Sequence, residues 1–395
     1  MKEISNTIFS FLKNNYSKKI QHKPFSPKGR KFLTKLFLLL SEGEALYKSA
    51  RIEKKSINIT QLIVNQDNMD NYIPEDIKKI IYKQKHATNI SFSIGGKNYN
   101  IYMYHSYVES ISIINQHIKR IYMWLYIASR FSHSKCSQNM NIKIYFTNAK
   151  KNLPNKQRLP IEQEHANTAF TTSCRKETEI NIFREEEWFK VCIHETFHCM
   201  GLDFSEMNNS ASDAMILKIF PLNTDVRLYE TYCEIWAETI NIMFISYLSS
   251  RNKSVQNMIE KTEAFLYYER LFSLFQCAKV IRHFHLSYHD IIEKTKRANE
   301  NYKEKTQILS YYILKCVYMF YIDEYVDWCI DNNGETLDFN KKDGSFEKTV
   351  ASYVIFLEKH YKLPEYLNAM KQFNNNMVRK NIVIENTLRM SLFEI

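Results

Sequence analysis

Glycine and proline are scarce in this chain, and their scarcity limits the folds open to it. Only 7 Gly and 7 Pro occur among 395 residues, about 3.5% together against an average near ~12%. This argues against long flexible linkers and repeated Gly-rich turns. Hydrophobic residues make up 45% of the chain, enough to bury one large core or two smaller ones. We therefore expect an ordered protein in which helices dominate.

Strand patterns are confined to the first half of the chain. Gly95 and Gly96 separate two runs rich in Ile, Phe and Tyr, which is typical of a β-hairpin. The segments with strand patterns are 91–104, 142–147, 166–174 and 178–183. Apolar residues at helical spacing predict a helix over 108–131, and from about residue 225 helix follows helix. The predicted fold class is α+β, with a small, twisted, mostly antiparallel sheet packed on a helix and a mainly helical C-terminal half.

The residues with the clearest chemical meaning form an HExxH motif, His194-Glu195-Thr196-Phe197-His198, in an apolar-faced helical segment. On a helix, positions i and i+4 share one face, so both imidazoles can bind one Zn²⁺. Glu195 stands beside them and is placed to act as a general base on a water molecule. The alternative is a pair of histidines that bind no metal.

A catalytic zinc site needs a third protein ligand. In the pattern HExxHxxGxxH the third ligand falls on Phe204, which cannot bind zinc. Asp203 and Asp213 are possible carboxylate ligands, but neither has a recognisable context. A second helix, residues 229–238, offers several glutamates instead.

Glu230, Glu234 and Glu238 recur at four-residue steps and therefore share one helix face. We predict that Glu234 binds the metal and that Glu238 orients a ligand histidine. In the alternative register Glu230 is the ligand and Glu234 stands behind it. A third alternative is that these glutamates form a solvated helix face and bind no metal.

The motif at 194–198 and the ExxA[DE] form of 234–238 resemble zinc metallopeptidases of the gluzincin group, the thermolysin-like branch of the HExxH enzymes. The resemblance covers residues 166–238 and implies a zincin-like fold, bound Zn²⁺ and a polypeptide substrate lying along the strand near 167–172. It also implies a Tyr or His that stabilises the oxyanion, for which we choose Tyr312 or the adjacent Tyr311, with the histidines near 283–289 as an alternative. The Asn/Ile/Lys/Tyr-rich composition resembles putative metalloproteases of large DNA viruses.

These observations divide the chain into an N-terminal helical region of unknown role (1–90), a catalytic subdomain with the HExxH helix (91–220) and a helical subdomain with the third ligand (221–395). The expected function is zinc-dependent peptide hydrolysis (a metalloendopeptidase). The alternative is a catalytically silent structural or virion protein that retains the scaffold.

Charge and cysteine content bear on partners and compartment. The formal charge of +11 favours acidic surroundings, but the Lys-rich stretches lack a nucleic-acid-binding motif, so we expect no nucleic-acid partner. The eight scattered cysteines form no CxxC pair and predict mostly reduced, buried thiols, with a secreted disulfide framework as the alternative. No apolar run has the length of a signal peptide or a bilayer span. We expect a soluble, intracellular protein, in the cytoplasm or in a viral particle.

Overall fold

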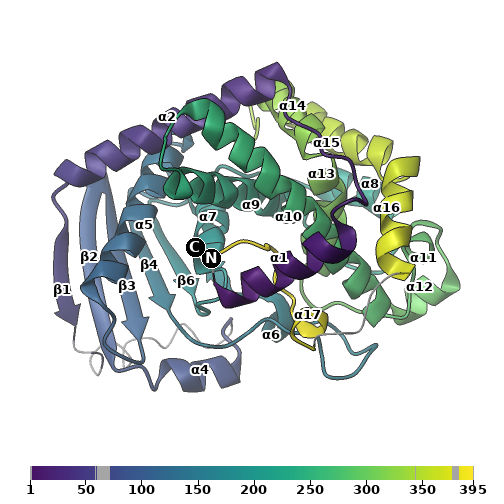
Figure 1. Ribbon diagram of the computed structural model, residues 1–395, viewed down its shortest axis with the longest axis horizontal. Helices are drawn as coiled ribbons and strands as arrows, with labels where there is room; N and C mark the ends of the chain where they lie inside the picture. The colour runs from purple at the N-terminus through teal and green to yellow at the C-terminus, as the bar shows by residue number, and fades with distance from the viewer. Residues whose placement is uncertain (1, 58, 60–71, 343, 376–381, 395) are drawn as a thin grey trace. The chain divides into compact units, whose positions relative to one another are not determined.

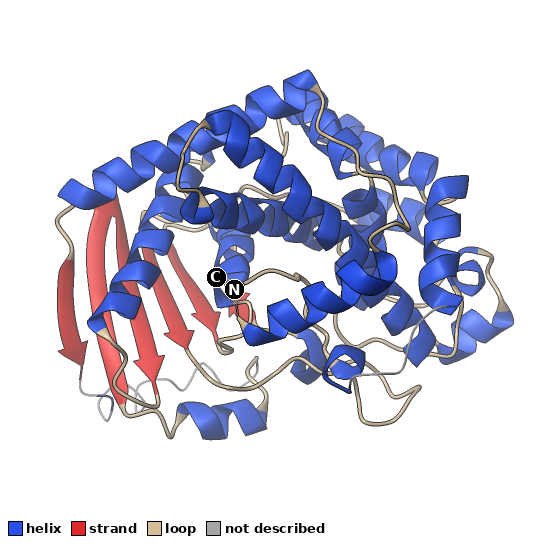
Figure 2. Cartoon of the chain, viewed as in Figure 1, coloured by secondary structure: helices blue, strands red, loops and turns tan. Residues whose placement is uncertain are grey.

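The computed structural model describes residues 2–57, 59, 72–342, 344–375 and 382–394. The chain packs into two compact units. The sheet unit comprises Thr34–Lys150 and Asn167–Glu206, and the helical unit comprises Met1–Leu33, Lys151–Ala166 and Met207–Ile395. All the described strands, drawn red in Figure 2, belong to the sheet unit. The class α+β is therefore confirmed. The functional division of the chain near residues 90 and 220 stays a prediction. Within the predicted N-terminal region, residues 58 and 60–71 lie outside the described residues.

The sheet unit contains six strands in the order β1-β2-β3-β4-β6-β5 (Figure 1). The strands are β1 (Glu53–Ile57), β2 (His86–Ile94), β3 (Lys97–His105), β4 (Asn139–Tyr145), β5 (Ala169–Thr171) and β6 (Glu177–Ile182). The predicted hairpin is confirmed: β2 and β3 pair antiparallel, with Ile94 opposite Lys97 across the two glycines. The sequence analysis missed β1, because its charged and exposed residues are typical of a protected sheet edge and carry no alternating pattern.

The sheet is mixed, whereas we predicted a mostly antiparallel one. The pairs β3–β4 and β4–β6 are parallel, and the other three described pairs are antiparallel. The first parallel pair follows from α5 (Ile111–Phe131), which carries the chain from the end of β3 back to the start of β4. A helical crossover of this length returns the next strand parallel to the previous one.

The HExxH motif lies in α7 (Trp188–Cys199), every residue of which is buried. The helix packs against β5, β6 and α5, and the rings of Trp124 on α5 and Phe197 on α7 stack with centroids 6.1 Å apart. Because neighbours surround it, α7 is apolar around most of its circumference, and its polar residues stand out as functional candidates. The sheet unit also contains α4 (Glu75–Ile81).

Helix α2 (Pro27–Ser49) contributes residues to both units. The helical unit is otherwise built from α1 (Glu3–Tyr16), α6 (Gln163–Ala166), α8 (Ser210–Ile219), α9 (Leu228–Ser249), α10 (Val255–His283), α11 (Tyr288–Ile292), α12 (Lys296–Asn301), the π-helix η1 (Leu309–Leu314), α13 (Lys315–Phe320), α14 (Ile322–Asn333), α15 (Phe346–His360), α16 (Pro364–Asn375) and α17 (Ile382–Asn386). Helices α9, α10, α13 and η1 pack on one another and form its core.

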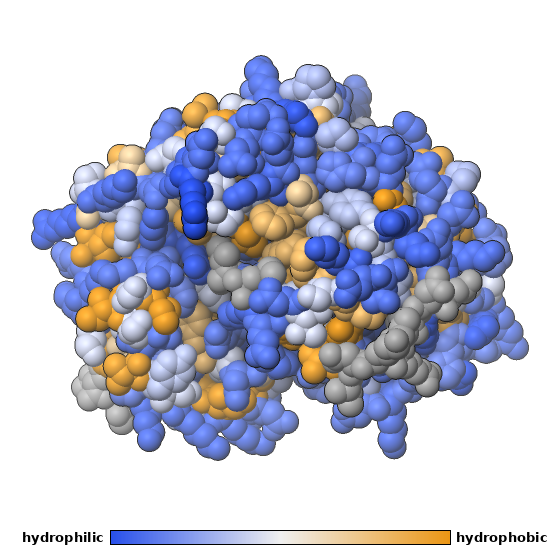
Figure 3. Space-filling model, viewed as in Figure 1, coloured by the Kyte–Doolittle hydropathy of each residue, from blue (hydrophilic) through white to orange (hydrophobic). Residues whose placement is uncertain are grey.

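Surface character agrees with the modest hydropathy of the chain. On the face drawn in Figure 3, hydrophilic side chains predominate and apolar ones are scattered among them. None of the helices that the structure describes combines the length and the apolarity needed to cross a membrane.

Candidate metal centre

The two motif histidines face each other with their ring nitrogens close together. His194 Nε2 and His198 Nε2 are 3.3 Å apart, and both side chains are buried. Two nitrogens bound tetrahedrally to one zinc at ~2.0–2.1 Å would stand roughly 3.3–3.4 Å apart. The spacing in α7 therefore fits a pair of ligands to one metal ion, as the i, i+4 pattern predicts.

A carboxylate fixes the second histidine from its other side. Asp203 Oδ2 lies 2.5 Å from His198 Nδ1, and Asp203 Oδ1 accepts a hydrogen bond of 3.1 Å from Ser205 Oγ. Only 2% of the Asp203 side chain is exposed. A carboxylate at Nδ1 holds the proton on that nitrogen and leaves Nε2 as a lone pair for a metal. We assigned this orienting role to Glu238, and the structure gives Asp203 to His198 instead.

Three side chains together form a buried His-His-Glu group that can hold a metal ion. His194, His198 and Glu230 each offer one ligand atom, and these three atoms lie within 4.8 Å of one another. Two imidazole nitrogens and one carboxylate oxygen are a donor set that Zn²⁺ takes in catalytic sites. Glu195, the neighbour of His194 in α7, is also largely buried, with 8% of its surface exposed.

The group contains Glu230, the alternative register, whereas Glu234 as the ligand stays a prediction. Glu234 is 1% exposed, and its carboxylate acts with that of Glu238 on Lys315, whose Nζ lies 2.8 Å from Glu238 Oε2. Burial works to lower the pKa of Lys315, but these carboxylates outweigh it and raise that pKa. Glu238 thus belongs to an internal ion pair.

The two tyrosines proposed for the oxyanion have different surroundings. The Tyr312 hydroxyl donates to the Leu388 carbonyl at 2.5 Å, and its side chain is 1% exposed. Tyr312 therefore packs in the core of the helical unit, and its catalytic role stays a prediction. Tyr311 is half-buried, and its hydroxyl donates to Glu230 Oε2 at 3.1 Å. Of the histidines near 283–289, His283 Nε2 lies 2.9 Å from the Leu159 carbonyl, and the His285 ring bonds to Gln157 Oε1.

The two thiols of α7 are poor nucleophiles. Burial raises the pKa of Cys192 to about 12 and that of Cys199 to about 12, so both are neutral thiols in the metal-free chain. Six of the eight cysteines are free and buried, as predicted, but Cys136 and Cys174 form a disulfide that the sequence analysis missed. Their separation of 38 residues carries no pairing signal.

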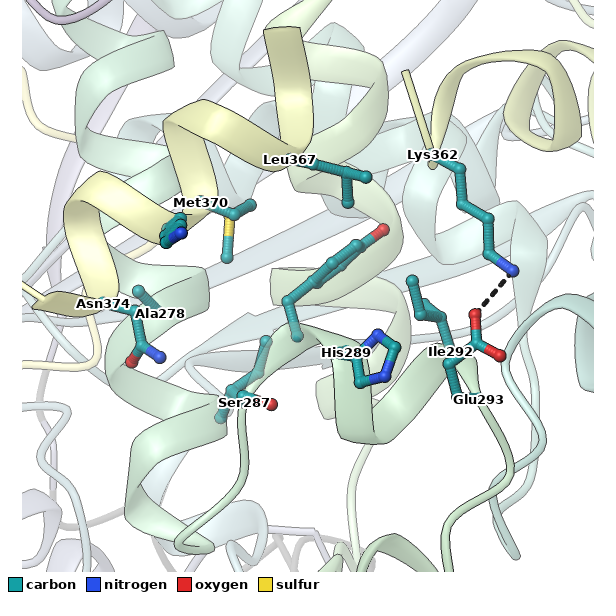
Figure 4. A pocket seen from close by; sticks show the side chains of 12 residues that line it. Ala278, Ser287, His289, Ile292, Glu293, Lys362, Leu367, Met370 and Asn374 are labelled. Carbon is teal, nitrogen blue, oxygen red and sulfur yellow. Dashed lines mark hydrogen bonds and ion pairs between the residues drawn. The ribbon is translucent and has the colours of Figure 1, made fainter. Parts of the chain in front are cut away.

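The helical unit also contains a pocket of about 310 Å³ (Figure 4). Its walls are mostly apolar, and three of its polar residues have partners within the protein: Glu293 Oε1 lies 2.8 Å from Lys362 Nζ, and Ser287 Oγ lies 2.7 Å from Asp290 Oδ2. It lacks a set of converging reactive groups, so the HExxH region remains the stronger candidate for chemistry.

Comparisons with known proteins add no relative to this description. No protein-family model, curated protein or solved structure matches the chain.

Proposed function

We propose that this protein is a zinc-dependent peptide hydrolase. The observation that carries the proposal is the pair of buried imidazoles in α7, 3.3 Å apart at Nε2, with a carboxylate on the outer nitrogen of His198. In the proposal His194, His198 and Glu230 hold the metal. A Zn²⁺ ion bound by these residues would supply a Lewis acid for a peptide carbonyl.

Glu195 is the general base in this proposal. It takes a proton from the attacking water and delivers it to the leaving amine, so one carboxylate serves both steps. Its burial supports the role, because a carboxylate shielded from bulk water interacts strongly with a nearby reacting group. Tyr311 positions Glu230 through the hydrogen bond to Oε2.

The proposed substrate is an extended polypeptide at the edge of the sheet. Among the described strands, β5 is the last in the sheet order and pairs with β6 alone. It also contacts α7. An exposed strand edge binds an extended peptide through main-chain hydrogen bonds, which makes β5 the natural place for a substrate backbone.

The experiment has two readings. Purified protein should carry about one Zn²⁺ per chain and cleave an unfolded protein or a mixed peptide library, and His194→Ala should lose the metal. Glu195→Gln should keep the metal and lower turnover by ~10²–10⁴-fold. The absence of stoichiometric zinc in the wild type would refute the metal site. Full turnover in Glu195→Gln would remove Glu195 from the mechanism.

A further inference from the structure

The disulfide joins two loops of the sheet unit. Cys136 lies in the loop between α5 and β4, and Cys174 lies in the loop between β5 and β6, with their Cα atoms 4.8 Å apart. Cys136 is 1% exposed, whereas Cys174 is half-buried and has exposed residues on both sides. Lys97 Nζ also holds the Cys136 loop, by donating to the Cys136 carbonyl at 2.7 Å. The disulfide therefore ties an exposed loop to an anchored one.

The disulfide packs against the C-terminal end of the HExxH helix. A Cβ atom added to Gly201 would lie 3.1 Å from Cys136 Sγ and 3.3 Å from Cys174 Cβ, and Gly201 has a φ of +64°. Gly201 N donates to the His198 carbonyl, and Leu202 N donates to the Phe197 carbonyl. These two bonds form a Schellman motif, the usual way to end a helix on a left-handed glycine.

This helix end links the candidate metal ligand to the residue that orients it. His198 lies in the last turn of α7, and Asp203 follows Gly201 by two residues. The geometry of the turn therefore sets the contact between Asp203 Oδ2 and His198 Nδ1.

The Cys136 loop and β5 also contact this turn. Ser137 Oγ, in the Cys136 loop, donates to the Cys199 carbonyl at 2.8 Å, and Thr178 Oγ1 of β6 donates to Ser137 Oγ at 2.9 Å. Thr171 Oγ1 of β5 lies 2.7 Å from Cys199 Sγ. The position of the turn thus follows the position of the Cys136 loop, which the disulfide ties to the Cys174 loop.

We propose that the Cys136–Cys174 disulfide is a redox switch that controls how tightly the HExxH helix holds its metal ion. In the oxidised chain the disulfide holds the turn at 199–203 and keeps Asp203 on His198. In the reduced chain the exposed loop is released, the turn moves more freely, and the metal is held less tightly. The inference rests on the proposed metal site.

The reduction is a thiol–disulfide exchange with a dithiol. A thiolate of the dithiol attacks the more accessible Cys174 sulfur, and Cys136 leaves as a thiolate that takes up a proton. The second thiol of the dithiol then displaces Cys174, which also ends as a thiol, and the dithiol is released as its own disulfide. Two electrons and two protons pass to the protein.

Zinc affinity of the two redox forms tests the switch. The full chain is prepared oxidised, with six free thiols expected after denaturation, and reduced by a dithiol that is then removed without oxygen. Competition with a chromophoric chelator should show affinity lower on the order of 10-fold in the reduced form, because Asp203 is an outer partner of the ligand His198. Reoxidation should restore the affinity.

The double variant Cys136→Ser/Cys174→Ser is the matched control. It should bind zinc as weakly as the reduced wild type and should not respond to the dithiol, which excludes effects of the other six thiols. A thermal unfolding scan of each form without metal establishes that the chain remains folded. Equal zinc affinity of oxidised and reduced protein, within twofold, would overturn the switch and leave the metal site standing. Absence of zinc binding in both forms would overturn the proposed function and the switch together.

Discussion

Replacing Asp203 by Asn tests the most specific feature of the candidate metal centre. The substitution keeps the shape of the side chain but removes the charge 2.5 Å from His198 Nδ1. A hydrogen bond to a charged, buried group contributes about 1.5–3 kcal/mol, and about 1.4 kcal/mol corresponds to a factor of ten. We therefore expect zinc affinity to fall by roughly 10–100-fold, the range found for partners of metal-bound histidines.

The assay is chelator competition at pH 7 on the purified, oxidised chain. Asp203→Glu should recover part of the lost affinity if the carboxylate itself matters. Asp213→Asn is the matched control, because it makes the same chemical change in α8. Asp213 is also partly buried: burial, and secondly the nearby Asp225, raise its pKa to about 6. A change below threefold in Asp203→Asn, with the thermal stability of the wild type, would refute the argument that this carboxylate positions His198.

The other predictions concern the helical unit. Lys315→Met should destabilise the protein by about 3–5 kcal/mol in urea unfolding at pH 7, because it leaves the fully buried carboxylate of Glu238 without its cation; a loss below 1 kcal/mol would contradict the ion pair. Burial raises the pKa of Glu304 to about 7, from 4.5, so its contribution to stability is complete below pH 4.5 and is lost as the pH rises to about 7. Glu304→Gln should remove about 3 kcal/mol of this pH dependence of the unfolding free energy. Parallel stability curves for the variant and the wild type would rule out a raised pKa of Glu304. Tyr311→Phe should weaken zinc binding up to ~10-fold, since its hydroxyl bonds Glu230 Oε2. Tyr312→Phe should leave zinc binding unchanged and cost about 1–2 kcal/mol of stability, because the Leu388 carbonyl loses its donor. Weaker zinc binding in Tyr312→Phe but not in Tyr311→Phe would favour Tyr312 as the functional tyrosine.

Local spacing was sufficient to predict the paired histidines. His194 and His198 are separated by one helical turn, and once the segment is helical no other part of the chain is needed to bring their rings together. The β2–β3 hairpin is local in the same sense, because Gly95 and Gly96 set the turn and the flanking apolar runs set the register. Both features could be predicted because the residues that form them are close in sequence.

The third candidate ligand and the choice between the two tyrosines depend on distant parts of the chain. Glu230 and Glu234 satisfy the same periodicity. They differ because Glu234 interacts with Lys315, which lies 81 residues further along the sequence. Tyr311 and Tyr312 are adjacent, but the π-helix η1 directs one hydroxyl to Glu230 and the other to Leu388. A helix face repeats identically along its length, so only packing against other elements can give neighbouring, equivalent positions different roles.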